Sequence, residues 1–172
     1  MRGKPMERLW APWRMKYILG EAGRSEGCVF CEAAHTTDDA AHLVVGRMSC
    51  TMTIMNLFPY TNGHMMVIPY RHISGLSDLT SEERLEIMEG AATAVDVLRE
   101  TFHCDGNNLG FNLGRPAGAG IDAHLHMHVV PRWNGDTNYM AVLDDTRVIS
   151  EALEETYRRL RAAYRERGLA PA

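Results

Sequence analysis

Long apolar runs are missing from this sequence. No stretch reaches the roughly 18 uncharged apolar residues that a membrane-crossing helix needs, and the chain starts on a charged, polar segment instead of the apolar run of a secretory signal. We therefore expect no membrane partner and a cytoplasmic location. Internal repeats, low-complexity tracts and long Pro/Gly-rich linkers are missing too, so 172 residues with 45% apolar side chains predict a single domain.

An excess of positive charge is also missing. The formal net charge is −4, so the chain has no basic field that would gather DNA or RNA, and a zinc-dependent nucleic-acid module is disfavoured. A phosphate-bearing partner must be captured by local groups, which suits small nucleotides better than nucleic acid.

Cysteine is scarce, with four in the chain, and without an export signal no disulfide framework is expected. Cys28 and Cys31 have the spacing of half a zinc site. A redox pair is the alternative, although the thioredoxin-like setting for it is missing. Cys50 and Cys104 have no partner pattern and are expected to be buried as small apolar side chains.

Short runs rich in Val, Ile, Met and Thr alternate with turn residues and predict consecutive antiparallel strands. With two main helices they predict an α+β fold, a five-stranded antiparallel meander covered by helices. The strands are expected at residues 43–48, 51–56, 64–69, 108–113 and 124–131.

Two amphipathic helices are predicted. Thr80 and Glu83 match a capping box, after which apolar residues recur at steps of three and four. These residues are Leu85, Met88, Ala92, Val95, Leu98 and Phe102. The second helix is marked by Ile149, Leu153, Tyr157, Leu160 and Tyr164.

The chain is expected to divide into three parts. Residues 1–27 form an arm with an aromatic cluster at Trp10, Trp13 and Tyr17, residues 28–140 form the main domain, and residues 141–172 form a helix and tail packed on it.

Three histidines separated by single apolar residues lie near the end of the main domain. Alternate residues of a strand share a face, so His124, His126 and His128 are expected to point the same way, about 6.6 Å apart per step. Spacing alone leaves metal binding and catalysis equally favoured, both above a solvated polar face. Leu125, Met127 and Val129 would then face the core.

The pattern of His, apolar, His, apolar, His, apolar, apolar over residues 124–130 resembles the motif that defines the histidine-triad family. The resemblance covers roughly residues 28–133. The Cys pair and residues 131–136, with the flanking motifs at 9–10, 112–114 and 118–120, make the chain similar to the bacterial branch that includes diadenosine tetraphosphate phosphorylases.

The resemblance implies that the middle histidine, His126, is the nucleophile that attacks the α-phosphate of an adenine nucleotide. A neutral imidazole approaches an anionic phosphate without repulsion, and its phosphoramidate adduct is labile. His128 beside it would orient the phosphate and stabilise the leaving group. His64 would orient the active-site histidines through a hydrogen bond.

Substrate contacts are implied by the same resemblance. Asn56 matches the asparagine that binds the ribose, and Asn112 matches a polar residue near the α-phosphate; turn or strand-end roles stay open for both. A loop of small residues before the triad would bring backbone N–H groups to the phosphate. The loop residues chosen for this contact are Gly118, Ala119, Gly120 and Ile121.

Two arginines and several aromatic residues are weaker candidates. Arg132 and Arg115 would hold distal phosphates, or else be ordinary surface arginines. Trp133 and the arm that contains Trp10 would stack on a base or cover a partner chain.

The resemblance extends to relatives in which a Cys pair, a histidine matching His72 and the first triad histidine bind zinc. We therefore expect a structural zinc site made by Cys28, Cys31, His72 and His124. His35, close to Cys31 in sequence, is a local competitor for a ligand position.

The predicted activity is nucleotidyl transfer or hydrolysis on adenine nucleotides such as diadenosine polyphosphates, with inorganic phosphate or water as acceptor. Hydrolysis of nucleoside phosphoramidates and a non-catalytic adenine-nucleotide sensor are the alternatives. By family analogy two chains would pair into a homodimer with a continuous sheet.

Overall fold

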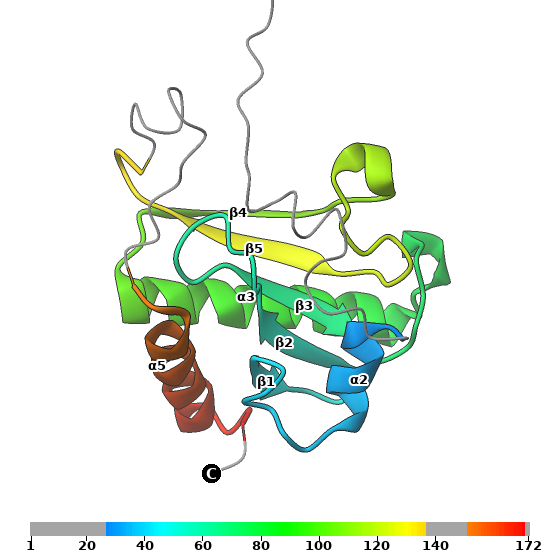
Figure 1. Cartoon of the computed structure of the whole chain (residues 1–172), viewed down its shortest axis with the longest axis horizontal. Coiled ribbons are helices and arrows are strands. Elements are labelled where there is room, and N and C mark those ends of the chain that lie inside the picture. The colour runs from blue at the N-terminus through cyan, green and yellow to red at the C-terminus, as the bar shows by residue number, and fades with distance from the viewer. Residues whose placement is uncertain (1–26, 137–150, 171–172) are drawn as a thin grey trace, which may run out of the picture.

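The computed structural model describes residues 27–136 and 151–170 as an antiparallel sheet with three helices (Figure 1). The strands are β1 (Val44–Arg47), β2 (Thr51–Met55), β3 (Met65–Pro69), β4 (Gly106–Phe111) and β5 (Met127–Arg132). The helices are α2 (Val29–His35), α3 (Ser81–Phe102) and α5 (Leu153–Glu166), with single 3₁₀ turns at Leu76–Asp78 and Arg115–Ala117. The predicted α+β class is confirmed.

The strand order β1-β2-β3-β5-β4 departs from a simple meander because β5 lies between β3 and β4. Helix α3 connects β3 to β4, so the two strands run in the same direction. They cannot be neighbours in an antiparallel sheet, and β5 pairs antiparallel with both. This order places the histidine strand in the middle of the sheet.

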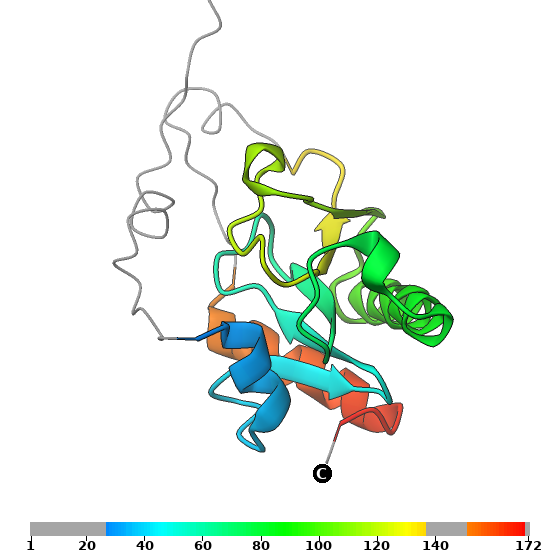
Figure 2. The same ribbon diagram turned by 90° about the vertical axis from the view of Figure 1, so that its right-hand side faces the viewer.

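The two faces of the sheet are covered by different helices (Figure 2). Met55 and Val67 belong to the larger core with α3 and α5. Their neighbours Ile54 and Met66 point the other way and pack with Phe30 of α2. Helix α2, which carries the Cys pair, therefore covers the face opposite the two longer helices.

The predicted inner face of α3 is wrong for half of its residues. Leu85 and Met88 are 61% and 56% exposed, and Ala92 is exposed as well. The buried face carries small residues such as Gly90, because a Cβ there would lie 3.0 Å from Val67. A larger side chain at Gly90 would hold the helix off the sheet. The buried apolar surface on the same face is supplied by Ile87, Val97 and Leu98.

Two glutamates occupy the buried face of α3 because each has specific partners. Glu83 accepts from the backbone N–H of Thr80 in the predicted capping box, which is confirmed, and it pairs with Arg71. Glu86 accepts from the Cys50 N–H and the Thr51 hydroxyl. Paired in this way, both carboxylates are buried without being left unsatisfied.

A two-arginine cluster fastens α2 to the rest of the fold. Asp39 lies 2.7 Å from the guanidinium groups of both Arg47 and Arg161. Arg47 also donates to the carbonyl of Ala33 at 2.7 Å and to that of Thr36 at 3.1 Å, at the end of α2. Since α2 has seven residues, these contacts and its packing must hold it in place.

Strand β5 begins at Met127 instead of at His124, so the expectation of three histidines on one strand is wrong. The Leu125 N–H donates to the carbonyl of Ile73, and His124 contacts the carbonyl of Pro69. These two hydrogen bonds hold the segment before Met127 away from β3. The pairing of β3 with β5 therefore starts at Met127. Leu125, Met127 and Val129 are buried as predicted.

Other predictions fall partly outside the described residues. The aromatic cluster of the arm lies wholly outside, as does Ile149, and the three-part division of the chain stays a prediction. Strand β4 starts two residues earlier than expected, and α5 buries Leu160 and Tyr164 as expected. Among residues 27–136 and 151–170, no helix combines the length and hydropathy that a membrane crossing demands.

Candidate active site and metal centre

His64 and His128 form a buried hydrogen-bonded pair where β3 and β5 lie side by side. His64 immediately precedes β3, and His128 pairs with Met66 in the ladder. The Nε2 of His64 lies 2.9 Å from the Nδ1 of His128. The expectation that His64 contacts a triad histidine is met by this geometry.

The protonation state of the pair follows from burial. Desolvation lowers the pKa of His64 to about 3, and the charges of His128 and His126 add to the effect. Desolvation, with the charge of His126, lowers the pKa of His128 to about 4. Both rings are therefore neutral at pH 7, so each has one donor and one acceptor nitrogen.

A backbone group decides which nitrogen of His64 carries the proton. The N–H of Tyr60 donates to His64 Nδ1 at 3.2 Å. His64 therefore holds its proton on Nε2 and donates it to Nδ1 of His128. The proton of His128 is in consequence on Nε2, where it is available as a donor.

Asn112 lies at that donor. Its amide nitrogen is 3.3 Å from His128 Nε2, and a half-turn of the amide presents its oxygen to the same atom, because the two ends are nearly equal in shape. Asn112 therefore lies next to His128, and its expected contact with the α-phosphate stays a prediction.

His126 is oriented by the residue two positions before it. Its Nδ1 lies 2.8 Å from the carbonyl oxygen of His124, so Nδ1 is the protonated donor and the lone pair is on Nε2. Burial lowers the pKa of His126, which keeps the ring neutral. Its ring centroid is 4.9 Å from that of His128 and 5.3 Å from that of Phe30. This arrangement leaves a neutral, fixed Nε2 beside the donor of His128.

The other predicted substrate residues have local partners. Asn56 follows β2, and its side-chain oxygen accepts from the Phe58 N–H at 2.9 Å, which is the turn role that the sequence left open. In the loop of small residues, the N–H groups of Gly118 and Ala119 bond to carbonyls within the loop. Nucleotide contacts by Asn56 and by Gly118, Ala119, Gly120 and Ile121 stay predictions.

Both candidate phosphate-binding arginines are paired with carboxylates. Arg132 makes two hydrogen bonds to Asp136, at 2.6 and 2.8 Å, and one to Asn108. Arg115 pairs with Asp122 at 3.0 Å on the surface. A role in holding distal phosphates stays a prediction for each and requires these pairs to open.

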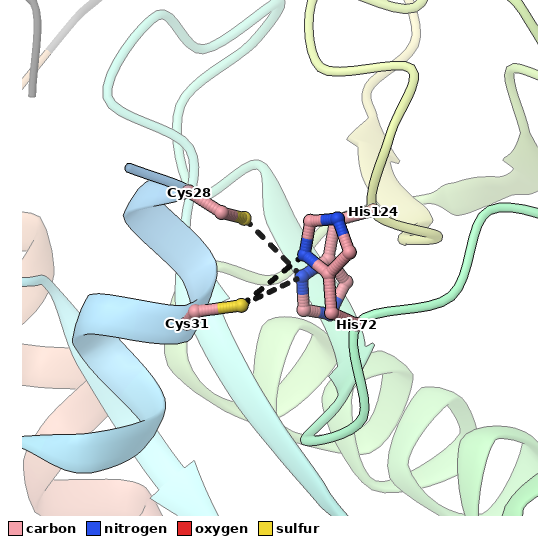
Figure 3. A group of neighbouring side chains, drawn as sticks. All are labelled: Cys28, Cys31, His72 and His124. Atoms are coloured by element: carbon pink, nitrogen blue, oxygen red, sulfur yellow. Dashed lines mark hydrogen bonds between the residues drawn. The ribbon is translucent and has the colours of Figure 1, made fainter. Parts of the chain in front are cut away.

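Cys28, Cys31, His72 and His124 converge, as predicted, on one point (Figure 3). Their ligand atoms all lie within 4.8 Å of one another. The closest sulfur–nitrogen separations are 3.2 Å for Cys31 with His72 and 3.3 Å for Cys28 with His124. The corresponding edges of a tetrahedral zinc site are roughly 3.5 Å, from the usual Zn–S and Zn–N lengths.

The chemistry of these four residues suits a cation. Burial and the neighbouring Cys28 raise the pKa of Cys31, so holding both thiols as thiolates requires a positive charge between them. His124 Nε2 lies 2.9 Å from the Pro69 carbonyl, which fixes the proton there and leaves Nδ1 as a ligand. His35 instead directs its Nδ1 to the Cys31 carbonyl at 2.6 Å and does not join the cluster.

Two aromatic residues without an expected role, Phe30 and Tyr60, contact the histidines. Phe30 lies between the two cysteines, a position that predicts proximity to the metal cluster. Tyr60 places its ring 4.5 Å from that of His64. A single aromatic residue in a loop follows no periodic pattern, so nothing in the sequence marks it.

The lowered pKa of His64 predicts an acid-sensitive fold. Because the folded state favours the neutral ring, the stabilisation is present above the unfolded pKa of about 6.5 and is lost as the pH falls toward the folded pKa. Replacing His64 by Gln should reduce the loss of unfolding free energy between pH 7 and 5 by about 1–2 kcal/mol. Urea unfolding at both pH values measures this.

His103→Asn is the matched control, because His103 is exposed at the end of α3 in a left-handed conformation that Asn tolerates. Its pH dependence should equal that of the wild type. Equal pH dependence in His64→Gln would contradict the assignment of a depressed pKa to His64.

Comparisons with known proteins agree with this site. A protein of Mycobacterium tuberculosis named AP-4-A phosphorylase is 40% identical over 162 residues, covering 90% of this chain and 83% of the relative. A bis(5'-nucleosyl)-tetraphosphatase of Schizosaccharomyces pombe is 31% identical over 90 residues, covering 52% of this chain and 49% of the relative.

The fold comparison gives a zinc-bound histidine triad family protein from Mycobacterium smegmatis, with a TM-score of 0.67 and 32% identity, covering 84% of this chain and 98% of the other. The HIT domain family model matches residues 38–135, which include the histidine pair and the whole triad. The chain therefore belongs to the histidine-triad (HIT) family.

Proposed function

We propose that this protein is a nucleotidyl-transferring enzyme that acts on adenine dinucleoside polyphosphates through a covalent nucleotidyl-His126 intermediate. One observation carries the proposal: a neutral His126 whose Nδ1 is tied to the His124 carbonyl, so that Nε2 is the only ring nitrogen with a lone pair. The 40% identity to an AP-4-A phosphorylase supports the choice of substrate.

In the first step, Nε2 of His126 attacks the α-phosphorus, the N–P bond forms, and the bond to the bridging oxygen breaks. The leaving nucleotide takes the electron pair. His128 donates a hydrogen bond from its Nε2–H to that oxygen as negative charge develops there, and it keeps the proton. The His126 ring becomes positively charged, and the His124 carbonyl stabilises it through the Nδ1–H.

In the second step, an oxygen of the acceptor forms a bond to phosphorus, the N–P bond breaks, and its electron pair returns to Nε2, which restores neutral His126. With diadenosine tetraphosphate the leaving group is ATP. Inorganic phosphate as acceptor then yields ADP, whereas water yields AMP. Phosphorolysis and hydrolysis therefore share the first step and differ only in the acceptor.

The adduct can be observed by intact-mass spectrometry after brief incubation with diadenosine tetraphosphate and denaturant quench. The wild type should gain one adenylyl group and His126→Ala none, because Nε2 of His126 is the neutral lone pair that lies beside the donor of His128. His103→Asn should behave as the wild type. Added phosphate should discharge the adduct to ADP, whereas discharge to AMP alone would make the protein a hydrolase.

An unmodified wild type, with diadenosine tetraphosphate intact after long incubation, would refute a catalytic role. The non-catalytic nucleotide sensor would then be the better account. An adduct that forms only with nucleoside phosphoramidates would instead favour the phosphoramidate hydrolase reading.

Zinc is the metal we propose for the cluster of two thiolates and two imidazoles, whose donor set and spacing suit a closed tetrahedral site. All four positions would be filled by protein, so the ion supplies rigidity and no step of the reaction. It would join α2 to the segments that carry His72 and His124.

Metal analysis of the purified protein should give one zinc per chain, and Cys31→Ser should lose it. Removing the ion should lower the melting temperature, because the site connects segments far apart in sequence. Cys50→Ser is the matched control, since Cys50 lies outside the cluster. Retention of full zinc content by Cys31→Ser would contradict the proposed ligand set.

We also propose a homodimer. Strand β4 lies at one edge of the sheet, and it carries Leu109, which is 44% exposed. Leu113 just beyond it is 49% exposed, and α3 exposes Leu85 and Met88. An unpaired strand edge and exposed apolar side chains suit a second copy that continues the sheet. The cytoplasmic location expected from the sequence stays a prediction.

Light scattering should give a mass of two chains for the wild type at micromolar concentration and of one chain for Leu85→Lys combined with Met88→Lys. Leu76→Lys, at a residue 41% exposed outside this surface, should leave the mass unchanged. A monomeric wild type would contradict the dimer.

A further inference from the structure

Tyr60 contacts both members of the histidine pair with its ring. Its centroid lies 4.5 Å from that of His64, with planes 38° apart, and 5.8 Å from that of His128, with planes 27° apart. The two imidazole centroids are 5.1 Å apart. The three rings therefore contact one another, and a rotation of either imidazole must displace the tyrosine.

The loop that carries Tyr60 is held by contacts to two elements, β5 and α3. The Thr61 hydroxyl donates to the Pro131 carbonyl of β5 at 2.9 Å, which ties the loop to the strand of His128. Gly63 has a φ of +78°, and a Cβ there would lie 2.9 Å from Leu98, so the turn packs closely on α3. Tyr60 is held in place by the sheet and by the helix.

We propose that Tyr60 is a positioning residue for the leaving-group step. Its backbone N–H sets the tautomer of His64, and its ring fixes the planes of His64 and His128, so that the Nε2–H of His128 points at the bridging oxygen. This inference rests on the proposed function, because it assigns a role within that reaction.

Two expected results distinguish a positioning role of Tyr60 from a contribution to packing alone. His128 assists departure of the leaving group, so misorientation of its ring matters most when the leaving group is poor. A packing defect that displaces His126 instead slows reaction with all leaving groups equally. Tyr60 should also have no effect once His128 is removed, because the two residues act as a unit.

The test uses single-turnover adduct formation on two aryl esters of AMP, one with p-nitrophenol and one with phenol, which share the nucleotide and differ in the leaving group. Tyr60→Ala should slow the phenyl ester by about tenfold and the p-nitrophenyl ester far less. Tyr60→Phe, which keeps the ring, should restore most of the lost rate on the phenyl ester.

The double variant Tyr60→Ala with His128→Ala should be no slower than His128→Ala alone. Equal slowing of both esters by Tyr60→Ala, or an unchanged rate on both, would overturn the proposal. So would a further loss of rate in the double variant.

A readout without turnover keeps this inference separate from the proposed function. Long-range ¹H–¹⁵N spectra of the imidazoles should show His64 and His128 each with one protonated Nε2 in the wild type. In Tyr60→Ala, which keeps the backbone N–H but removes the ring, both tautomers should persist, whereas the signals of His128 should broaden because its ring plane is no longer fixed. Unchanged spectra would overturn the positioning role even if no ester reacts, whereas changed spectra without any adduct would refute only the enzymatic function.

Discussion

Burial keeps the imidazoles of this site neutral, and a neutral imidazole has one donor and one acceptor nitrogen. For three of the rings a backbone group decides which nitrogen carries the proton, and for His128 the side chain of His64 does so. The Tyr60 N–H does so for His64, the Pro69 carbonyl for His124 and the His124 carbonyl for His126. Main-chain geometry, fixed by the sheet and its adjoining turns, thereby determines where each ring offers a proton or a lone pair.

His124 connects the metal cluster to the nucleophile. Its side chain belongs to the cluster, and its carbonyl orients His126. Phe30, between the two cysteines on α2, packs its ring against both histidines, at centroid distances of 5.5 Å for His124 and 5.3 Å for His126. A change that moves α2 would therefore reach the nucleophile both through the chain and through an aromatic contact.

Cys28 and Cys31 could be predicted as half a metal site from their spacing alone, whereas His72 and His124 were expected as ligands only because the chain resembles zinc-binding relatives. The strand assignment for His124 failed because two long-range hydrogen bonds, from Leu125 to Ile73 and from His124 to Pro69, compete with strand pairing. The face of α3 was misassigned because periodicity ranks residues by hydrophobicity. Close approach of the helix to the sheet requires a small residue at Gly90, and Glu86 is buried there by partners on β2 and the preceding turn that no local pattern records.

Tyr60 illustrates what a single sequence leaves out. Its contacts depend on how the turn before β3 folds back beside β5, and no spacing rule links it to His128. The nucleotide contacts expected from the sequence also depend on interactions that a single sequence does not show. The side chain of Asn56 and the N–H groups of Gly118 and Ala119 serve local turns, so their second role depends on the ligand.

The central claim is that main-chain hydrogen bonding makes Nε2 of His126 the nucleophilic atom. The most direct measurement is ³¹P–¹⁵N NMR of the trapped, isotope-labelled adduct, which identifies the nitrogen bonded to phosphorus. We predict a bond to Nε2, with Nδ1 still protonated and facing the His124 carbonyl. A bond to Nδ1, or to another histidine, would contradict the account.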